Sequence, residues 1–526
     1  MSDSQVLIVG AGPTGLVLAL YLTRLGVRVR IVDKAAEPGT TSRAIAVQAR
    51  TLEVYRQVGL ADAVVQRGLK FIAANLWFAS EQVGRVPFGD MGRGLSPFPY
   101  ILAFAQDEHE RLLIDRLAQL GVKVERPTEL LSLTNDNDGV RAVLERADGS
   151  TETCSALYVA GCDGAHSRVR DSLGVGFPGG TYEHLFYVAD VDASGPAVND
   201  ELHVILDEAD FLAVFPLKGD RHVRLIGTVK DEMAAKADRG QLGWGDVSSH
   251  VLERMRITVN TVNWFSTYHV HHRVAERFRV GRAFLLGDAA HIHSPVGGQG
   301  MNTGIGDSVN LAWKLAAVIA GRASERVLAT YAPEREAFAK RLVATTDRAF
   351  TIVTKSGPVA RRVRVNVVPR VVPALFTIRR FRRLMFRTVS QTGVHYRGSA
   401  LSVGRAGRVR AGDRLPWLAL ERGARSTADN HVPLASLAWQ VHVYGSSSQT
   451  TQTICRDHGV DVHEFAWSAS AERVGFERDA VYLVRPDGHV GLATSKSGAS
   501  ALTSYLNEWG IRKPSPQSRP PSGVRL

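Results

Sequence analysis

The residues with the clearest chemical meaning form a glycine-rich turn at 10–15, GAGPTG, which follows an apolar run and precedes Asp33 by eighteen residues. Glycines in such a turn allow a tight bend and let the backbone approach a pyrophosphate, which then meets the free N–H groups of the next helix. Asp33 ends a second apolar run, where its carboxylate can bind both hydroxyls of an adenosine ribose and disfavours a 2′-phosphate. The pattern predicts a dinucleotide site, and by itself it does not separate FAD from NAD.

Two further turns place an acid beside glycines. In 158–170, Asp163 follows an apolar run and precedes a serine and two arginines, although an Asp-Gly pair alone often marks an ordinary turn. In 281–302, Asp288 follows another apolar run, and glycines then open a helix. Asp288 can hold a ribitol or ribose hydroxyl there, and a helix N-terminus stabilises the negative charge that a reduced flavin carries. The third turn therefore favours a flavin.

Apolar runs and their spacing predict the elements that position these turns. Strands over 6–9 and 27–32 enclose a helix over 14–25, which is a βαβ start. The turn Asp148-Gly149 predicts a hairpin over 140–161. Further strands are predicted over 202–206, 211–217, 222–229, 283–286, 440–444 and 481–484, and further helices over 106–120, 300–319 and 499–509.

Composition limits the class of protein. The chain has 526 residues, of which 44% are hydrophobic and 22% charged, so a disordered or collagen-like chain is excluded and about two to four domains are expected. Cys154, Cys162 and Cys455 lack the spacing of a metal site or a disulfide framework, which favours a reducing, cytoplasmic setting and no metal. The uncharged run 4–23 is interrupted by glycines and Pro13, so we expect a soluble protein rather than a membrane span.

The net charge of +12 is concentrated, because residues 361–387 hold nine arginines and no acid. Such a segment can bind nucleic acid or acidic lipid. The alternative is a solvated helix face, since apolar residues recur between the arginines at helical spacing and would face inward. Pro369 and Pro373 would break that helix in two. No nucleic-acid motif accompanies the segment. We therefore favour the solvated helix, and contact with a membrane surface stays open. The apolar residues are Val363, Val367, Val371, Leu375, Ile378, Phe381 and Met385.

In this order and at these separations, the three turns resemble those of the single-component FAD-dependent aromatic hydroxylases, the class A flavoprotein monooxygenases, and in particular the phenol and chlorophenol hydroxylase branch. The stretches 42–53 and 106–112 support the resemblance, which covers roughly the first 400 residues. It implies an α/β fold with an FAD-binding Rossmann-like domain of the hydroxybenzoate hydroxylase/glutathione reductase-2 type. The implied parts are FAD-binding segments 1–180 and 279–345, a β-sheet substrate domain 181–278, an arginine-rich helical connection 346–400, a thioredoxin-like domain 401–512 and a disordered tail 513–526. The thioredoxin-like domain has no Cys-x-x-Cys and would be structural or hold a homodimer together.

The resemblance also implies a role for individual residues. Most would bind FAD, Asp163 with Gly164 would in addition receive NAD(P)H, and Arg224 and Pro295 would lie at the reacting centre. His291 and His293 are expected to be structural. The residues expected to contact FAD are Gly10, Gly12, Pro13, Thr14 and Gly15 at the pyrophosphate, Asp33 and Lys34 at the adenosine ribose, Arg43 and Gln106 at the ribityl–phosphate part, Asp288 at the ribitol, Gly298, Gly300, Met301 and Asn302 against the isoalloxazine, and Pro295 over its reacting edge.

The implied chemistry is hydroxylation through a flavin C4a-hydroperoxide, with tightly but non-covalently bound FAD, NADPH or NADH as transient reductant, and O₂. Water must be excluded from such a site. Ile45 replaces the pocket aspartate of phenol hydroxylases, Ile226 replaces the tyrosine that follows Arg224, and Leu217 stands where hydroxybenzoate enzymes have a carboxylate-binding arginine. An apolar or polycyclic phenolic or aromatic substrate is therefore expected, and no base that would deprotonate it can be named.

Three other functions remain open. Baeyer–Villiger oxidation, epoxidation or antibiotic inactivation would use the same fold. An NAD-dependent dehydrogenase without flavin would leave the turn at Asp288 unexplained. A basic protein that binds membrane or nucleic acid would use the arginine segment.

Overall fold

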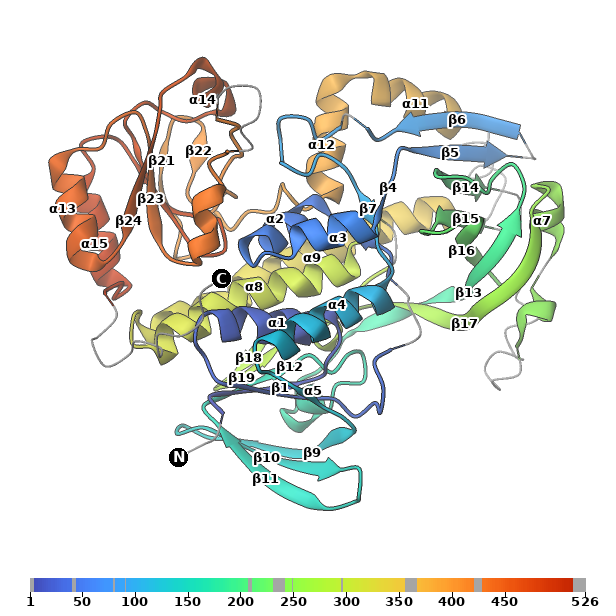
Figure 1. The fold of residues 1–526 in the computed structure, drawn as a ribbon, viewed down its shortest axis with the longest axis horizontal. Helices are drawn as coiled ribbons and strands as arrows, with labels where there is room; N and C mark the ends of the chain where they lie inside the picture. The colour runs from blue at the N-terminus through green and yellow to red at the C-terminus, as the bar shows by residue number, and fades with distance from the viewer. Residues whose placement is uncertain are drawn as a thin grey trace.

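The structure is a computed structural model that describes residues 4–39, 44–78, 81–89, 91–206, 211–229, 242–247, 249–294, 297–354, 367–420 and 428–513. Arg43 and Pro295, two of the predicted site residues, lie outside these ranges, as do Arg361, Arg362, Arg364 and residues 514–526. Figure 1 shows a parallel sheet covered by helices, a long antiparallel sheet beside it, and a separate C-terminal unit.

A six-stranded sheet in the order β18-β19-β12-β1-β2-β8 carries the predicted dinucleotide turns. Its strands from β19 to β8 run parallel, and β1 and β12 are buried along their whole length, as expected of strands covered on both faces. The carboxyl ends of these strands meet at one edge, where a doubly wound sheet binds its ligand. The strands are β1 (Val6–Val9), β2 (Val29–Val32), β8 (Val124–Glu125), β12 (Tyr158–Gly161), β18 (Arg279–Val280) and β19 (Ala283–Leu285).

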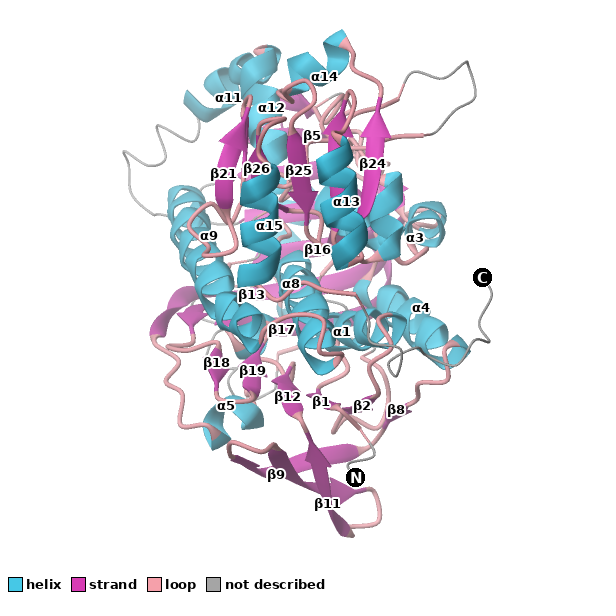
Figure 2. Ribbon diagram, turned by 90° about the vertical axis from the view of Figure 1, so that its left-hand side faces the viewer, coloured by secondary structure: helices cyan, strands magenta, loops and turns pink. Residues whose placement is uncertain are grey.

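Helices pack above this sheet (Figures 1 and 2). The first, α1 (Pro13–Arg24), and the long α8 (Gly300–Ile319) lie against each other, and most residues of both are buried. The other described helices that begin before residue 355 are α2 (Ala49–Gln57), α3 (Ala61–Arg67), α4 (Gln106–Gln119), α5 (Arg168–Ser172), α7 (Ser249–Arg254) and α9 (Tyr331–Thr354). The predicted ranges 300–319 and 6–9 agree with the structure, and the predicted helix 14–25 begins and ends one residue earlier.

The predicted hairpin around Asp148-Gly149 is present as β10 (Val140–Arg146) and β11 (Thr151–Ala156), which pair with β9 (Thr128–Asn135). The prediction was wrong in continuing the second strand to residue 161. The chain leaves this sheet at Leu157, because the N–H groups of Leu157 and Tyr158 both donate to the carbonyl oxygen of Gln5 beside β1. A single run of sequence therefore contributes to two sheets.

An eight-stranded sheet in the order β20-β17-β13-β16-β15-β14-β5-β6 forms the second layer. Its longest pair is antiparallel, β13 (Gly179–Ser194) with β17 (Thr258–Val274). Two strands from early in the chain, β5 and β6, join it through a parallel pairing of β14 with β5, although sequence placed them with the FAD-binding part. The other strands are β5 (Ala73–Phe78), β6 (Glu81–Pro87), β14 (Leu202–Leu206), β15 (Phe211–Pro216), β16 (His222–Thr228) and β20 (His291–Ile292). A small sheet, β3 (Ala46–Val47), β7 (Leu102–Ala103) and β4 (Leu69–Lys70), lies between the two layers.

The C-terminal unit is a six-stranded mixed sheet in the order β22-β21-β26-β25-β23-β24. Strand β23 runs parallel to β24 and antiparallel to β25, and β25 forms a hairpin with β26. The rings of Trp313 in α8 and Trp439 meet edge to face at 5.4 Å and join this unit to the rest of the protein. The elements are β21 (Val403–Ala406), β22 (Val409–Arg410), β23 (Gln440–Tyr444), α13 (Gln449–His458), β24 (Asp461–Phe465), α14 (Ala469–Val474), β25 (Val481–Val484), β26 (Val490–Thr494) and α15 (Ala499–Glu508).

The described part of the arginine segment forms two helices, α11 (Val368–Thr377) and α12 (Arg379–Val389). The segment is divided into two helices as predicted, but the prediction that the prolines cause the break was wrong. Pro369 lies in the first turn of α11, where no N–H donor is needed, and Pro373 lies inside the helix. The break is at Ile378, whose backbone is extended. Among the described residues, no helix combines the length and the apolar character needed to cross a membrane.

Candidate functional site

The turn from Gly10 to Gly15 is built for a ligand that approaches its backbone. Gly10 has a φ of 101°, and a Cβ there would overlap the carbonyl group of Cys162. A Cβ on Gly15 would overlap the carbonyl oxygen of Gly10, so both positions require glycine. A Cβ on Gly12 would meet no atom of the described chain within 4 Å, and no side chain caps the start of α1. The first N–H groups of α1 are therefore left to an anion.

Asp33 lies beside this turn at the end of β2. Its Oδ2 accepts a hydrogen bond from the N–H of Ala11 at 2.6 Å, and its Oδ1 accepts one from the N–H of Ala35 at 2.8 Å. Arg126 lies 3.1 Å from Oδ1 and also donates to the carbonyl oxygen of Ala11. Sequence reasoning missed Arg126, which follows β8 and reaches the site only because β8 is the neighbour of β2. Lys34, also predicted here, is exposed.

Asp288 occupies the turn that follows β19. It is exposed, although Gly287 and Ala289 on either side of it are buried. The turn is fixed by Asp307 of α8, whose Oδ2 accepts hydrogen bonds from the N–H of Gly287 at 2.9 Å and from Nε2 of His291 at 2.8 Å. The turn thus presents one carboxylate outward from a rigid base, and the expected structural role of His291 agrees with this geometry.

Asp307 is itself held by a buried cation, Arg335 of α9. Nε of Arg335 donates to Oδ1 of Asp307 at 2.5 Å, and neither side chain is exposed by more than 3%. Burial alone would raise the pKa of Asp307, but Arg335 and His291 outweigh it, and the pKa is lowered. Sequence reasoning missed both residues. The only available signal was a lone acid in the middle of an apolar helix.

The first and third turns touch each other at Thr14. A Cβ on Gly304 would overlap Oγ1 of Thr14, and a Cβ on Gly287 would lie 2.7 Å from the same atom. The hydroxyl of Ser308 donates to the carbonyl oxygen of Thr14 at 2.7 Å. The phosphate turn and the Asp288 turn are therefore parts of one rigid wall.

The glycine turn before α8 is attached to β3 and α2 by Asn302. The Nδ2 of Asn302 donates to the carbonyl oxygens of Ala46 and Gly298, and its Oδ1 accepts from the N–H of Gln48 and the hydroxyl of Thr51. The side-chain amide is fully occupied, so any contact of Asn302 with a flavin would come from its backbone. Gly298 has a φ of 59° and packs against Ala46. Gly300 begins α8, and Met301 is half-buried.

Asp163 caps a short helix in the second turn. Its Oδ1 accepts from the hydroxyl of Ser167 at 2.5 Å and its Oδ2 from the N–H of Val169 at 3.0 Å. Burial raises the pKa of Asp163, and the bond from Ser167 partly opposes that shift. Its contact with FAD or a nicotinamide dinucleotide stays a prediction.

Gln106 opens α4 and fixes the chain directly after Arg43. Its side-chain oxygen accepts from the N–H of Ala44 at 3.3 Å, and its amide donates to Glu110 at 2.8 Å. Gln106 and Glu110 therefore lie beside Ala44, the first described residue after Arg43.

Arg224 is fully buried on β16. Its Nε and Nη2 donate to the two carboxylate oxygens of Asp190, each at 2.7 Å, and its Nη1 donates to the carbonyl oxygen of Ala44 at 3.4 Å. Sequence reasoning missed Asp190, which stands opposite Arg224 in the pairing of β13 with β16. The pair with Asp190 holds the buried guanidinium group of Arg224 next to residue 45, shielded from water.

An apolar cluster adjoins the glycine turn, and we call it the Leu217 cluster. Ile45 and Leu217, the two positions that depart from the phenol and hydroxybenzoate hydroxylase patterns, both belong to it. Ala46, against which Gly298 packs, belongs to it as well. Its buried members are Ile45, Ala46, Phe71, Ile101, Ala103 and Leu217, with Leu69, Phe88, Phe215 and Val389 partly buried around them.

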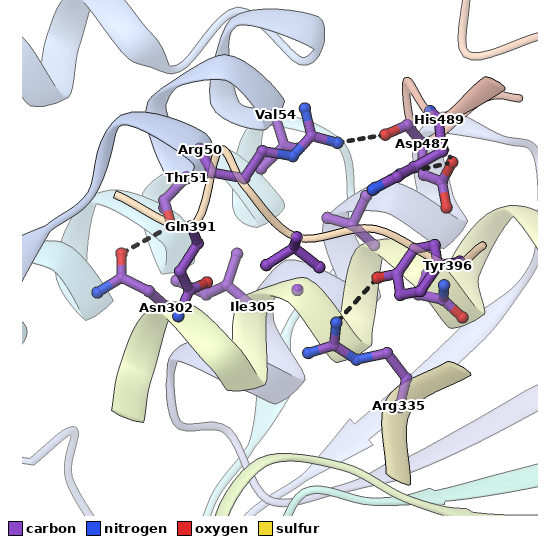
Figure 3. A pocket seen from close by; sticks show the side chains of 14 residues that line it. Arg50, Thr51, Val54, Asn302, Ile305, Arg335, Gln391, Tyr396, Asp487 and His489 are labelled. Atoms are coloured by element: carbon purple, nitrogen blue, oxygen red, sulfur yellow. Dashed lines mark hydrogen bonds and ion pairs between the residues drawn. The ribbon is translucent and has the colours of Figure 1, made fainter. Parts of the chain in front are cut away.

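A small cavity lies on the other side of Asn302, between α2, α8 and the C-terminal unit (Figure 3). Its volume of about 30 Å³ holds one or two waters and no aromatic ring. Figure 3 shows Thr51 pointing to Asn302 and Arg335 pointing to Tyr396, whose hydroxyl accepts from Nη1 of Arg335 at 2.9 Å. Arg50 reaches the carbonyl oxygen of Asp487 across this cavity. The cavity marks the contact of the C-terminal unit with the Asp307–Arg335 pair.

Comparisons with known proteins give a consistent picture. A family model described as "FAD binding domain" matches residues 3–346. The 6-methylpretetramide 4-monooxygenase of Streptomyces rimosus is 34% identical, over 95% of this chain and 93% of that protein. The pentachlorophenol 4-monooxygenase of Sphingobium chlorophenolicum is 33% identical, over 68% of this chain and 66% of that protein. The solved structure of the anhydrotetracycline hydroxylase OxyS from Streptomyces rimosus aligns with a TM-score of 0.76 at 28% identity, over 97% of this chain and all of that chain.

Proposed function

The chain belongs to the FAD-binding family of flavin-dependent monooxygenases, and we propose that it hydroxylates an apolar, polycyclic phenolic or aromatic substrate with NADPH or NADH and O₂. The observation that carries the proposal is the junction of three turns at one sheet edge with the Leu217 cluster and Arg224 beside them. Bound FAD supplies the electron transfer and the activation of O₂ in such an enzyme.

The residues present fit FAD. The open backbone at Gly12 and the uncapped start of α1 suit the pyrophosphate, and Asp33 suits the adenosine ribose. Asp288, exposed on a rigid turn, suits a ribitol hydroxyl. We assign the isoalloxazine to the turn that includes Gly298 and to the start of α8, whose N–H groups stabilise negative charge.

The roles of Arg43 and Pro295 remain proposals that rest on their motifs, because both lie outside the described residues. Gln106 supports the assignment of Arg43, since it fixes the residue that follows.

The Leu217 cluster is proposed to receive the substrate ring and to exclude water. None of its members carries a titratable side chain, so the cluster offers no base. Arg224 donates to Asp190 and to the carbonyl oxygen of Ala44, which positions Ile45 at the edge of the cluster. Exclusion of water favours transfer of oxygen to the substrate over release of H₂O₂.

The substrate class follows from the same cluster and from relatives that span the whole chain. Two of them are named for 6-methylpretetramide and anhydrotetracycline, whereas the relative named for pentachlorophenol covers two thirds of the chain. An apolar wall without a carboxylate-binding arginine suits a large ring system better than a small benzoate. We therefore place a polycyclic phenolic compound first.

We further propose that the domain limits inferred from sequence hold, with β5 and β6 added to the substrate unit. The order β23-α13-β24-α14-β25-β26-α15 supports a thioredoxin-like C-terminal domain. Burial raises the pKa of the Cys455 thiol to about 12, so this lone thiol stays protonated and serves packing. A structural role of this domain therefore fits better than redox chemistry.

The test is the rate of flavin reduction by NADPH and by NADH, with and without a panel of polycyclic phenols, followed by product mass. A compound that accelerates reduction and gains one oxygen atom supports hydroxylation. A product with oxygen inserted into a ring, or an epoxide, would show that the enzyme carries out Baeyer–Villiger oxidation or epoxidation in place of hydroxylation. A protein that binds no FAD even after reconstitution would refute the proposal.

A further inference from the structure

Helix α11 exposes an apolar face to solvent. Val367, Val371 and Ile378 are 44%, 45% and 51% exposed, and Ala374 is exposed between them. Val371 and Ala374 lie on one side of α11, and Val367 and Ile378, which flank the two ends of the helix, continue the same spacing of four, three and four residues. The prediction that the apolar residues of this segment face inward was therefore wrong for three of them.

The opposite side of α11 is apolar as well. Phe376 is buried in the main hydrophobic core, and Val372 packs against the same core. A surface helix of a soluble protein normally has one apolar side and one polar side. Helix α11 has two apolar sides, and the described part of the chain covers only one of them. The exposed apolar side of α11 is suited to contact with an apolar region of a binding partner.

Exposed arginines lie on α11 and on α12, the helix that follows it. Arg370 is exposed on α11, and Arg379, Arg380 and Arg387 are exposed on α12. Leu384, 61% exposed, lies between the last two. Residues 367–389 contain no acid. Burial, together with Arg379 and Arg387, lowers the pKa of Arg383, as expected where positive charges are crowded. Any partner that binds this part of the surface is therefore expected to carry negative charge.

We propose that the outer face of α11 and the exposed arginines of α12, together called the α11–α12 face, dock the protein on an anionic lipid bilayer. An amphipathic basic helix binds in the plane of such a surface, with its apolar side chains among the acyl chains and its arginines at the headgroups. Figure 1 shows both helices at the rim of the molecule, with α11 along β6. Docking therefore places the eight-stranded sheet, rather than the FAD-binding sheet, beside the bilayer.

Two other partners fit the α11–α12 face less well. A second copy of the chain would bring arginines against arginines, and a few half-exposed aliphatic side chains fall short of the ~800 Å² per partner that a stable interface buries. Single-stranded nucleic acid binds through exposed aromatic rings, whereas Phe376 and Phe386 here are buried. An aliphatic stripe bordered by arginines matches lipid best.

The test is co-sedimentation of the FAD-loaded, full-length protein with vesicles of phosphatidylcholine alone and of equal parts phosphatidylcholine and phosphatidylglycerol. We expect binding to the anionic vesicles only. Val371→Ser/Ile378→Ser should weaken it about tenfold, since two aliphatic side chains no longer enter the bilayer. Arg379→Gln/Arg380→Gln should weaken it by a similar factor, and more at low salt.

Matched controls separate this face from general basicity. Val432, 48% exposed on the C-terminal unit, is replaced by serine, and the exposed Arg28 and Arg141 are replaced by glutamine. Both controls should bind the vesicles as the unchanged protein does. All substituted positions are exposed, and unchanged thermal unfolding would verify that each variant folds.

Four results would overturn the proposal. The first is no binding to anionic vesicles at any salt concentration. The second is binding that the control substitutions weaken as much as the α11–α12 pairs. The third is light scattering that shows a dimer lost with Val371→Ser/Ile378→Ser, which would make a second copy the partner. Retention on DNA that the arginine pair abolishes, without vesicle binding, would assign the face to nucleic acid.

Discussion

Arg485 and Glu334 are 151 residues apart in sequence and form a fully buried bidentate ion pair, with Nη1 and Nη2 of Arg485 donating to the two carboxylate oxygens at 2.7 and 3.0 Å. Glu334 also accepts from Nζ of Lys314 at 2.8 Å. Asp487, on the same hairpin as Arg485, pairs with it at 2.6 Å and accepts from the indole of Trp313. The C-terminal unit is therefore joined to α8 and α9 by buried charges as well as by apolar contact.

Replacement of Glu334 by glutamine should cost about 3–5 kcal/mol of unfolding free energy, because it leaves Arg485 and Lys314 buried with one acid fewer. Urea unfolding of the FAD-free protein measures this cost. The control is Glu325→Gln, whose carboxylate is 58% exposed and faces Arg279 at 3.7 Å. Equal stability of the two variants would show that the buried pair adds nothing.

The same pair predicts a loss of stability in acid. Burial alone would raise the pKa of Glu334, but Arg485 and Lys314 outweigh it, and the pKa lies well below the ordinary 4.5. In unfolded chains this carboxyl takes up its proton at a higher pH than in folded ones, so acidification below about 4.5 favours unfolding. The melting temperature should fall less steeply with pH in Glu334→Gln than in the unchanged protein. Parallel curves would contradict the prediction.

Gly12→Ala should separate folding from cofactor binding. A Cβ at this position meets no described atom within 4 Å, so the FAD-free variant should melt as the unchanged protein does. The Kd for FAD, measured by quenching of flavin fluorescence, should rise about tenfold, or about 1.4 kcal/mol, because the added methyl group obstructs the pyrophosphate. Gly398→Ala, equally free of close atoms in the described chain, is the control and should bind FAD normally. Normal binding by Gly12→Ala would place the pyrophosphate elsewhere.

Phe215→Ala should uncouple the reaction, if the proposed function holds. Phe215 borders the Leu217 cluster, and its loss admits water to the predicted substrate site. The fraction of NADPH that ends as H₂O₂ should rise, while the FAD content stays unchanged. Phe211→Ala removes the same ring from the same strand but beside Phe186, away from the cluster, and should leave the coupling unchanged. Equal uncoupling in both variants would locate the substrate elsewhere.

Sequence predicted those elements whose apolar runs are bounded by glycine or polar residues, as in β1, β14, β23, β25 and α8. The resemblance also implied that Gly10–Gly15 and Asp288 belong to one region, and in the structure both turns follow neighbouring strands of one parallel sheet. Pairing across long separations could not be predicted. Nothing in the run 73–87 indicates that β5 pairs with β14, more than 120 residues later.

The site residues that sequence missed are charges that look like surface residues in a linear chain. Asp190, Asp307, Arg126 and Arg335 each become part of the site only through a partner on another element. A charge is buried at such a position only when its counter-charge is already fixed by the fold. The resemblance assigned roles only to the glycines and acids within the motifs. The supporting ion pairs lie outside those motifs, so the resemblance gave no information about them.

The distance along the chain between Glu334 and Arg485 has a consequence for biosynthesis. During translation the ribosome releases Lys314 and Glu334 long before the hairpin that carries Arg485 and Asp487. Until that hairpin emerges, α8 and α9 face water where the finished protein has buried ions, and Tyr396, the hydrogen-bond partner of Arg335, lacks the ring of His489 beside it. The last stretch of the nascent chain therefore completes the support of the Asp288 turn. A chain released early would carry the glycine motifs and yet lack that support.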